Sequence, residues 1–369
     1  MVLAYPQFIG HSYTSCQNCH FNPFGGGQLN DYGRAVSATA ISSGKIYPKE
    51  WNEEKVSYTS GFLFRKPKQQ WFRTQLNYRR FKLVTSPRGE NEQERYITMQ
   101  LDARLALKFG EKDKFLFVGD YGYVPEVQAP PPGTDPDEHY RSRNLYFGYR
   151  PKPTLGVYAG LMDKVYGIRV VEHNAFSRIN PQATQHDQTL GVATHFLKGD
   201  WEGGVHGFVG NTNQDKEHRQ KGGSTMVEKT IFKTHRVGGS FLTSKSDFLT
   251  LTSYAVHGRF NFKEGSALLT EIGQTERTSH SAVPATTSRY GLLQTYVRPV
   301  RGLYLLANIE YQRNDLQADD YVLRWAPGIQ WFPIQRVEIR ADIYNTRNFL
   351  TNNSTKDSWM YLLQTHIWL

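Results

Sequence analysis

The chain alternates apolar and polar residues over long stretches. In residues 99–109, one face would carry Leu101 and Leu105 and the other face Asp102 and Arg104. The same period of two recurs at 305–312 and 337–344. This period predicts β-strands with one apolar face. Alternation alone does not separate a membrane barrel from a soluble sandwich, because both bury one face of each strand.

The lengths of the connections favour the barrel. Short turns alternate with longer polar loops along the chain, except near 243–247, where a short turn takes the place of a long loop. The longer loops are expected at 86–94, 127–139, 164–187, 211–224, 276–286, 315–320 and 349–357. Short turns at one end and long loops at the other are typical of outer-membrane barrels. We therefore predict an all-β fold, a transmembrane antiparallel outer-membrane β-barrel of about 16 strands, with one continuous strand at 140–150.

Composition agrees with a barrel and excludes several other classes. Mean hydropathy is −0.58 although 14% of the residues are aromatic. No stretch reaches the roughly 18 consecutive apolar residues that a membrane helix needs, which excludes a helical membrane protein. Lys and Arg exceed Asp and Glu by 44 to 34, and the net charge of +10 suits an anionic partner, an anionic lipid surface or a cation-lined pore. No basic run or recognition helix is visible, so nucleic acid is not an expected partner.

Strand parity predicts a polar lumen. The charged residues expected to face inward are Arg73, Arg79, Asp102, Arg104, Lys108, Asp120, Arg324, Glu338, Arg340 and Asp342. A barrel of about 16 strands is wide enough for an aqueous channel or for a plug. Cationic residues outnumber anionic ones in this lining, which favours selectivity for anions.

The two cysteines of the chain lie in one motif, Cys16-Gln17-Asn18-Cys19-His20. This C-x-x-C-H spacing is the one that attaches a c-type haem, with two thiols on the porphyrin vinyl groups and the histidine on the iron. A zinc site would need two further soft ligands, and a thioredoxin-like site would need a βαβ context, whereas glycines follow here. One covalent haem c, held by Cys16 and Cys19 with His20 as proximal ligand, is therefore predicted, with a disulfide or a metal site as the alternatives.

The segment that carries the motif differs from the rest of the chain. Residues 1–50 are predicted to form a small monohaem segment with a short helix at 29–42, residues 51–70 a linker, and residues 71–369 the barrel. We expect the segment to insert as a plug, because it buries too little apolar surface to be stable alone. Haem attachment of this kind takes place outside the cytoplasm. Residues 1–4 resemble the end of a secretory signal, so the chain is expected to be mature or truncated.

The sequence does not identify the second axial ligand of the iron. His11 could fold back on the haem, and parity directs His257 and His366 into the lumen together with His195 and His206. Met360 also faces inward, and water at an open iron is a further alternative.

The N-terminal segment resembles the fused monohaem cytochrome-porins of iron-oxidising bacteria. The resemblance rests on Tyr5-Pro6, on the motif within 15–20, on Leu29-Asn30-Asp31-Tyr32-Gly33-Arg34, and on a barrel that fills the remainder. About 30 residues are specific, and the Gly25-Gly26-Gly27 insert departs from the iron-oxidase pattern. Arg34 could pair with a haem propionate, although a surface arginine of a helix needs no such role.

The resemblance implies electron transfer across the bacterial outer membrane. An extracellular redox substrate such as Fe(II) would exchange electrons with the haem, and a periplasmic c-type cytochrome would be the partner inside. The protein would then be an electron carrier, an Fe(II)-oxidising cytochrome rather than a classical enzyme. The alternatives are a passive porin for small anionic solutes with a structural haem or plug, and a peroxidase-like enzyme with an open iron. Such a barrel could also associate into homo-oligomers.

Overall fold

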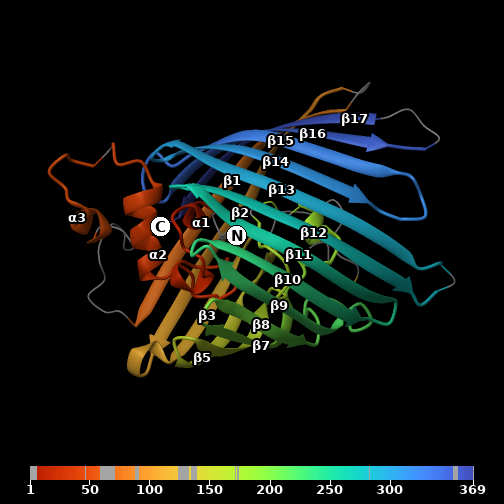
Figure 1. The fold of residues 1–369 in the computed structure, drawn as a ribbon, viewed down its shortest axis with the longest axis horizontal. Coiled ribbons are helices and arrows are strands. Elements are labelled where there is room, and N and C mark those ends of the chain that lie inside the picture. The colour runs from red at the N-terminus through yellow and green to blue at the C-terminus, as the bar shows by residue number, and fades with distance from the viewer. Residues whose placement is uncertain are drawn as a thin grey trace.

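The protein is a closed antiparallel β-barrel (Figure 1). The computed structural model describes residues 6–368 apart from 46, 59–70, 88–90, 124–132, 134–138, 171, 173, 282 and 352–355. The sheet closes because β1 (Phe72–Pro87) pairs with both β2 (Gln93–Phe109) and β17 (Lys356–Trp368). The predicted antiparallel barrel of about 16 strands is therefore confirmed. None of the described helices is long and apolar enough to cross a membrane.

Each of the remaining strands pairs with its neighbours in the chain, except that β4 and β5 both pair with β3. They are β3 (Phe115–Tyr123), β4 (Tyr140–Arg141), β5 (Leu145–Lys152), β6 (Leu155–Met162), β7 (Thr189–Lys198), β8 (Trp201–Phe208), β9 (Lys221–Ile231), β10 (His235–Lys245), β11 (Leu249–Lys263), β12 (Ser266–Ser279), β13 (Thr286–Val300), β14 (Leu303–Arg313), β15 (Tyr321–Trp331) and β16 (Val337–Phe349).

The fourth strand of the barrel is interrupted, which corrects the continuous strand predicted at 140–150. β3 pairs with β4 through Gly122 and Tyr123 and with β5 through 115–119. Between them, the backbone N–H groups of Arg143 and Asn144 donate to the Asp120 carboxylate over 2.7 and 2.9 Å. A side chain thus takes the place of the neighbouring strand as acceptor, and β4 and β5 together make up one strand.

The two faces of the sheet have the polarity that parity predicts. All ten charged residues predicted to face the lumen are buried, as are the four barrel histidines. Exposed apolar side chains cover the outside, among them Leu101, Val192, Val256, Ile272 and Ile329. Such a surface fits the hydrocarbon core of a bilayer, and the polar interior fits a porin-type lumen.

The loop between β6 and β7 differs from its prediction as a polar external loop. It carries α4 (Phe176–Ile179), and Tyr166, Ile168 and Phe176 within it are buried. Its backbone N–H groups donate to barrel carboxylates, Ile168 to Glu271 over 2.6 Å and Phe176 to Glu310 over 2.7 Å. The loop therefore folds into the lumen. Of the other expected long loops, parts of 86–94, 127–139, 276–286 and 349–357 lie outside the described residues, whereas the short connection near 243–247 is confirmed.

The N-terminal segment lies at one end of the barrel, on the side where the C-terminus also lies (Figure 1). Its helices are α1 (Gln7–Gly10), η1 (Cys16–Asn18), α2 (Asp31–Val36), the π-helical turn η2 (Ser37–Ile41) and α3 (Glu53–Tyr58). The predicted helix at 29–42 corresponds to α2 and η2. The expected linker at 51–70 includes α3, and residues 59–70 lie outside the described residues.

Apolar contacts join this segment to the barrel wall. Phe8, Leu29 and Ile41 pack with Tyr304 and Phe332 in one buried cluster. Such a cluster removes apolar surface of the segment from water, which the segment could not achieve alone. The N-terminal segment is therefore called the plug below.

Candidate functional site

The motif is held by local structure on both sides. After His20, Gly25, Gly26 and Gly27 have φ values of 84°, 73° and 65°, in the left-handed region where glycine is favoured. This turn reverses the chain, so that His20 forms an isolated β-bridge with Leu29.

The helix after the turn is fastened to the motif. Asn30 caps α2 by accepting from Gly33 N–H over 2.8 Å, and its own backbone N–H donates to the Cys19 carbonyl over 2.9 Å. Gly33 approaches that carbonyl so closely that a Cβ atom would collide with it. The position of α2 therefore fixes the position of the motif.

Three polar contacts fasten the plug to well-separated strands of the barrel. Gln7 Nε2 donates to Gln330 Oε1 on β15 over 2.6 Å, and Ser15 Oγ donates to Glu202 Oε1 on β8 over 2.8 Å. On β1, Arg73 Nη2 donates to Asp31 Oδ2 over 2.7 Å. Because β1, β8 and β15 lie apart around the closed sheet, the plug spans the lumen.

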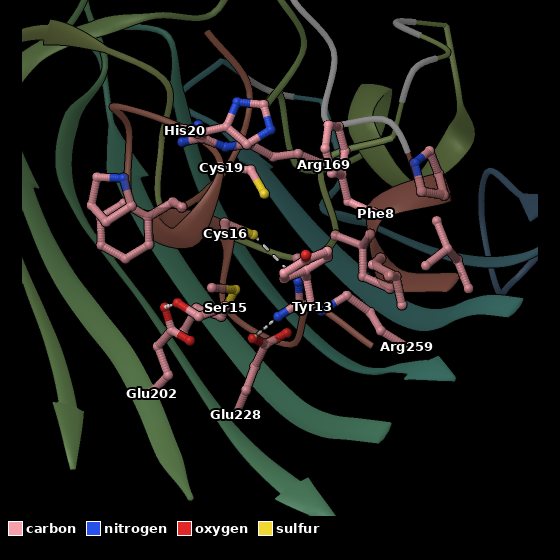
Figure 2. A pocket seen from close by; sticks show the side chains of 18 residues that line it. Phe8, Tyr13, Ser15, Cys16, Cys19, His20, Arg169, Glu202, Glu228 and Arg259 are labelled. Carbon is pink, nitrogen blue, oxygen red and sulfur yellow. Dashed lines mark hydrogen bonds and ion pairs between the residues drawn. The ribbon is translucent and has the colours of Figure 1, made fainter. Parts of the chain in front are cut away.

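A cavity lies between the motif, the barrel wall and the inserted β6–β7 loop. Together with the space that is open to solvent, it contains about 740 Å³ not filled by protein atoms. Figure 2 shows Cys16, Cys19 and His20 on one segment of the plug, with Glu202, Glu228 and Arg259 facing them from the barrel. The further lining residues are Pro6, Phe8, Ile9, Tyr13, Ser15, Pro23, Phe24, Gly167, Ile168, Arg169, Met226 and Leu269.

Burial keeps His20 and Cys19 uncharged in this setting. Burial lowers the pKa of His20 to about 4, although the backbone of Gly26 and Gly27 partly opposes this shift. Burial raises the pKa of the Cys19 thiol to about 12. A redox-active C-x-x-C pair depends on a depressed thiol pKa, so the site does not resemble a thioredoxin-type disulfide. Cys16 and Cys19 are free thiols in the structure.

These residues fit a c-type haem. His20 is a neutral imidazole whose Nδ1 is buried without a hydrogen-bond partner, and a neutral imidazole is the form that binds a metal. Phe8, Ile9, Phe24 and Leu269 offer the apolar surface that a porphyrin plane needs. The donor set, two free thiols three residues apart followed by a histidine, is the one that the covalent attachment uses.

Two arginines supply positive charge beside the cavity. Arg169, from the inserted loop, donates to the Gly25 carbonyl over 2.5 Å and lies 3.5 Å from Asp163. Arg259, from β11, donates to Cys16 Sγ over 3.3 Å and pairs with the Glu228 carboxylate. Guanidinium groups bind carboxylates in bidentate fashion, so Arg169 is a candidate for a haem propionate, whereas Arg259 lies at the thiol that would bind a vinyl group.

Arg34, the arginine expected from the sequence, lies elsewhere. It lines a smaller cavity of about 330 Å³ beside Arg336 and Trp368 and donates to the Thr74 carbonyl over 3.4 Å. Burial lowers the pKa of Arg34 to about 10. The structure therefore places Arg34 between the plug and β1 rather than at the Cys16–His20 cavity.

The candidates for the second axial ligand also lie outside the cavity lining. His257 Nε2 lies 3.1 Å from Glu228, His366 Nδ1 lies 3.1 Å from Glu338, and His195 Nε2 lies 2.8 Å from Glu202. His11 is a plug residue next to Gly10, whose carbonyl accepts from Gly265 N–H. His206 is buried on β8, and neither of its ring nitrogens has a hydrogen-bond partner. Met360 lines a separate cavity between β1, β2, β16 and β17.

Sequence reasoning did not identify Met226, Arg169 and Arg259 as site residues. Parity could have indicated that Met226 and Arg259 face the lumen, but it does not indicate which lumen residue lies opposite the motif. The buried apolar residues of 165–170 were a signal that the β6–β7 loop is not a plain external loop.

The comparisons with known proteins identify the barrel. No protein-family model matches the sequence, and no curated protein matches it. Among solved structures, a loop-deletion mutant of OmpT, an outer-membrane protein of Vibrio cholerae, is 10% identical with a TM-score of 0.62, covering 81% of this chain and 99% of that chain. The anion-selective porin from Comamonas acidovorans is 7% identical with a TM-score of 0.60, covering 81% and 99%.

A channel protein gives a similar result. The outer-membrane channel DcaP of Acinetobacter baumannii is 11% identical with a TM-score of 0.60, covering 81% of this chain and 97% of that chain. The chain therefore has the fold of outer-membrane porins. Each of these three structures covers 81% of this chain, so about a fifth of the chain lies outside each match.

Proposed function

We propose that this protein is an outer-membrane electron carrier. One haem c, attached to Cys16 and Cys19 with His20 as an axial ligand, would lie inside the barrel. It would pass single electrons between an extracellular donor or acceptor, such as Fe(II), and a periplasmic c-type cytochrome. The observation that carries the proposal is the cavity inside the lumen, onto which all three motif residues open. When bound, the haem supplies one-electron storage, and the chain supplies its position.

The position is what electron transfer across a membrane requires. The apolar band of a porin is about 25 Å tall, and a single haem held outside it could not connect the two sides. Anchoring of the plug through Asp31, Ser15 and Gln7 places the motif within the barrel. From the other side, Arg169 of the inserted loop reaches the plug at Gly25.

The test is a visible redox spectrum of the detergent-extracted protein, expressed with a secretory signal and the haem-maturation machinery. We expect reduced c-type bands to appear when Fe(II) is added. The Cys16→Ala/Cys19→Ala double variant, whose barrel is unchanged, is expected to carry no covalent haem. Absence of haem from the wild-type protein would refute the proposal. A haem that only a strong artificial reductant reduces would remove Fe(II) as donor and keep the cytochrome.

A passive porin for small anionic solutes is the second candidate, and the comparisons favour it. The similar structures named above include a channel and an anion-selective porin, and this chain carries a net charge of +10. Conductance across a planar bilayer separates the two functions. A plugged electron carrier is expected to conduct poorly, whereas a steady anion-selective current through the wild-type barrel would favour the porin. One solved structure of Vibrio cholerae OmpT is a trimer form, so the oligomeric state of this barrel should be measured in the same detergent preparation.

A further inference from the structure

The cavity offers few atoms that could complete the coordination of a haem iron. Proteins use histidine, methionine, cysteine thiolate or tyrosine for this purpose. Among the described residues that line the cavity, His20 is the single histidine, and both cysteines are used for attachment. Tyr13 and Met226 remain.

Tyr13 is a poor ligand in its present setting. Its hydroxyl lies 2.8 Å from the hydroxyl of Tyr32. Burial raises the pKa of Tyr13, and a tyrosine binds iron as the phenolate. Glu202 and Glu228, which also line the cavity, are both in ion pairs with Arg236, and Glu228 pairs with Arg259 as well.

Met226 has none of these constraints. It lies on β9, it is 8% exposed, and its thioether is neutral and needs no hydrogen bond. Met226 packs in one buried cluster with Phe21 and Phe24, the residues that follow His20 in the plug. Across the sheet it pairs with Gly204, whose missing side chain leaves room for the Phe24 ring. The plug therefore meets the wall of the barrel at Met226.

We propose that the Met226 thioether is the second axial ligand of the haem iron, opposite His20. This assignment rests on the proposed function, because it requires the haem. It gives a role to the thioether that lines the cavity beside the ion pairs of Glu202, Glu228 and Arg259. Methionine and histidine together raise the reduction potential of a c-type haem compared with other ligands. A closed coordination shell also disfavours the peroxidase-like alternative, which needs an open iron.

The test compares three variants of the haem-loaded protein in detergent. Met226→Leu keeps the volume and removes the sulfur. Met162→Leu is the matched control, because Met162 is buried in the same cluster but does not line the cavity. Met226→His replaces the sulfur by an imidazole. Covalent haem is measured in each by the spectrum of its pyridine complex, and ligation by the sulfur-to-iron charge-transfer band of the oxidised protein.

We expect the charge-transfer band in the wild type and in Met162→Leu. We expect its complete loss in Met226→Leu, with a high-spin spectrum and uptake of added imidazole or cyanide. Met226→His is expected to be low-spin without the band and to have a lower reduction potential. In all variants the haem content stays at the wild-type level, because both cysteines are intact.

The outcomes separate the two proposals. A wild-type protein without covalent haem refutes the proposed function. A haem-loaded wild type that lacks the band, or a band that persists in Met226→Leu, overturns the assignment of Met226 alone. A bis-histidine spectrum that is lost in His206→Ala would assign the ligand to His206 instead.

Discussion

The ion pair between Asp31 of the plug and Arg73 of β1 is expected to hold the plug in the lumen. Arg73 donates through Nη2 and Nε to the two carboxylate oxygens, and Lys108 Nζ lies 3.4 Å from the same carboxylate. Arg73 is 4% exposed, whereas Asp31 is 46% exposed. Asp31→Asn would therefore remove a carboxylate from a buried guanidinium.

The magnitude follows from these exposures. Hydrogen bonds to charged groups contribute about 1.5–3 kcal/mol each when buried, and exposed ion pairs contribute less than about 1 kcal/mol. For a pair that is buried on one side only, we expect Asp31→Asn to cost roughly 2 kcal/mol of plug docking. This corresponds to about a 30-fold change in the ratio of docked to undocked plug.

The assay is single-barrel recording in a planar bilayer, where an undocked plug opens the lumen. We expect the open probability of Asp31→Asn to rise about 30-fold over wild type. Asp113→Asn is the matched control, because Asp113 is also half-exposed and lies 3.3 Å from Lys108, but belongs to the turn after β2. Equal open probabilities in the two variants would refute the role of Asp31.

Acid should reproduce the effect of the substitution. Burial of Asp31 opposes its ionisation, but Arg73, Lys108 and Arg34 together lower its pKa below the ordinary 3.8. A depressed pKa stabilises the docked state above the pKa of the undocked carboxyl, and this stabilisation is lost as the pH falls through the lower pKa of the docked state. The wild-type open probability should therefore rise below about pH 4, while Asp31→Asn should show no such rise.

Two further predictions concern the barrel. Gly204→Ala would place a Cβ atom against the Phe24 ring and the Thr194 carbonyl of β7, and should destabilise plug docking by about 1–3 kcal/mol. Gly207→Ala is the control, because no atom lies within 4 Å of its Cβ position, and it should be neutral in the same bilayer recordings. Val256→Arg on the lipid face should lower the free energy of unfolding by about 2–4 kcal/mol, measured by urea titration in lipid vesicles, and Val300→Arg at a strand end by about 1 kcal/mol or less. Equal losses in either pair would contradict the corresponding assignment.

The fold could be predicted from the sequence because strand parity is a local property. Alternation decides which side chains face lipid and which face the lumen, and all ten predicted lumen charges are buried. The motif at 16–20 is equally local, since its chemistry depends on the spacing of its own residues. Where parity was broken, as at 140–150, the cause was a distant carboxylate, Asp120, which no local pattern reveals.

The walls of the candidate site depend on the tertiary structure. The sequence by itself determined the polarity of the two faces of the barrel strands and the spacing of Cys16, Cys19 and His20. Only docking of the plug decided which lumen residues lie opposite the motif, because each position in the closed sheet faces residues from distant parts of the chain. The β6–β7 loop brings Arg169 to the cavity. It folds into the barrel because its apolar residues are buried there, whereas they would be exposed to water outside.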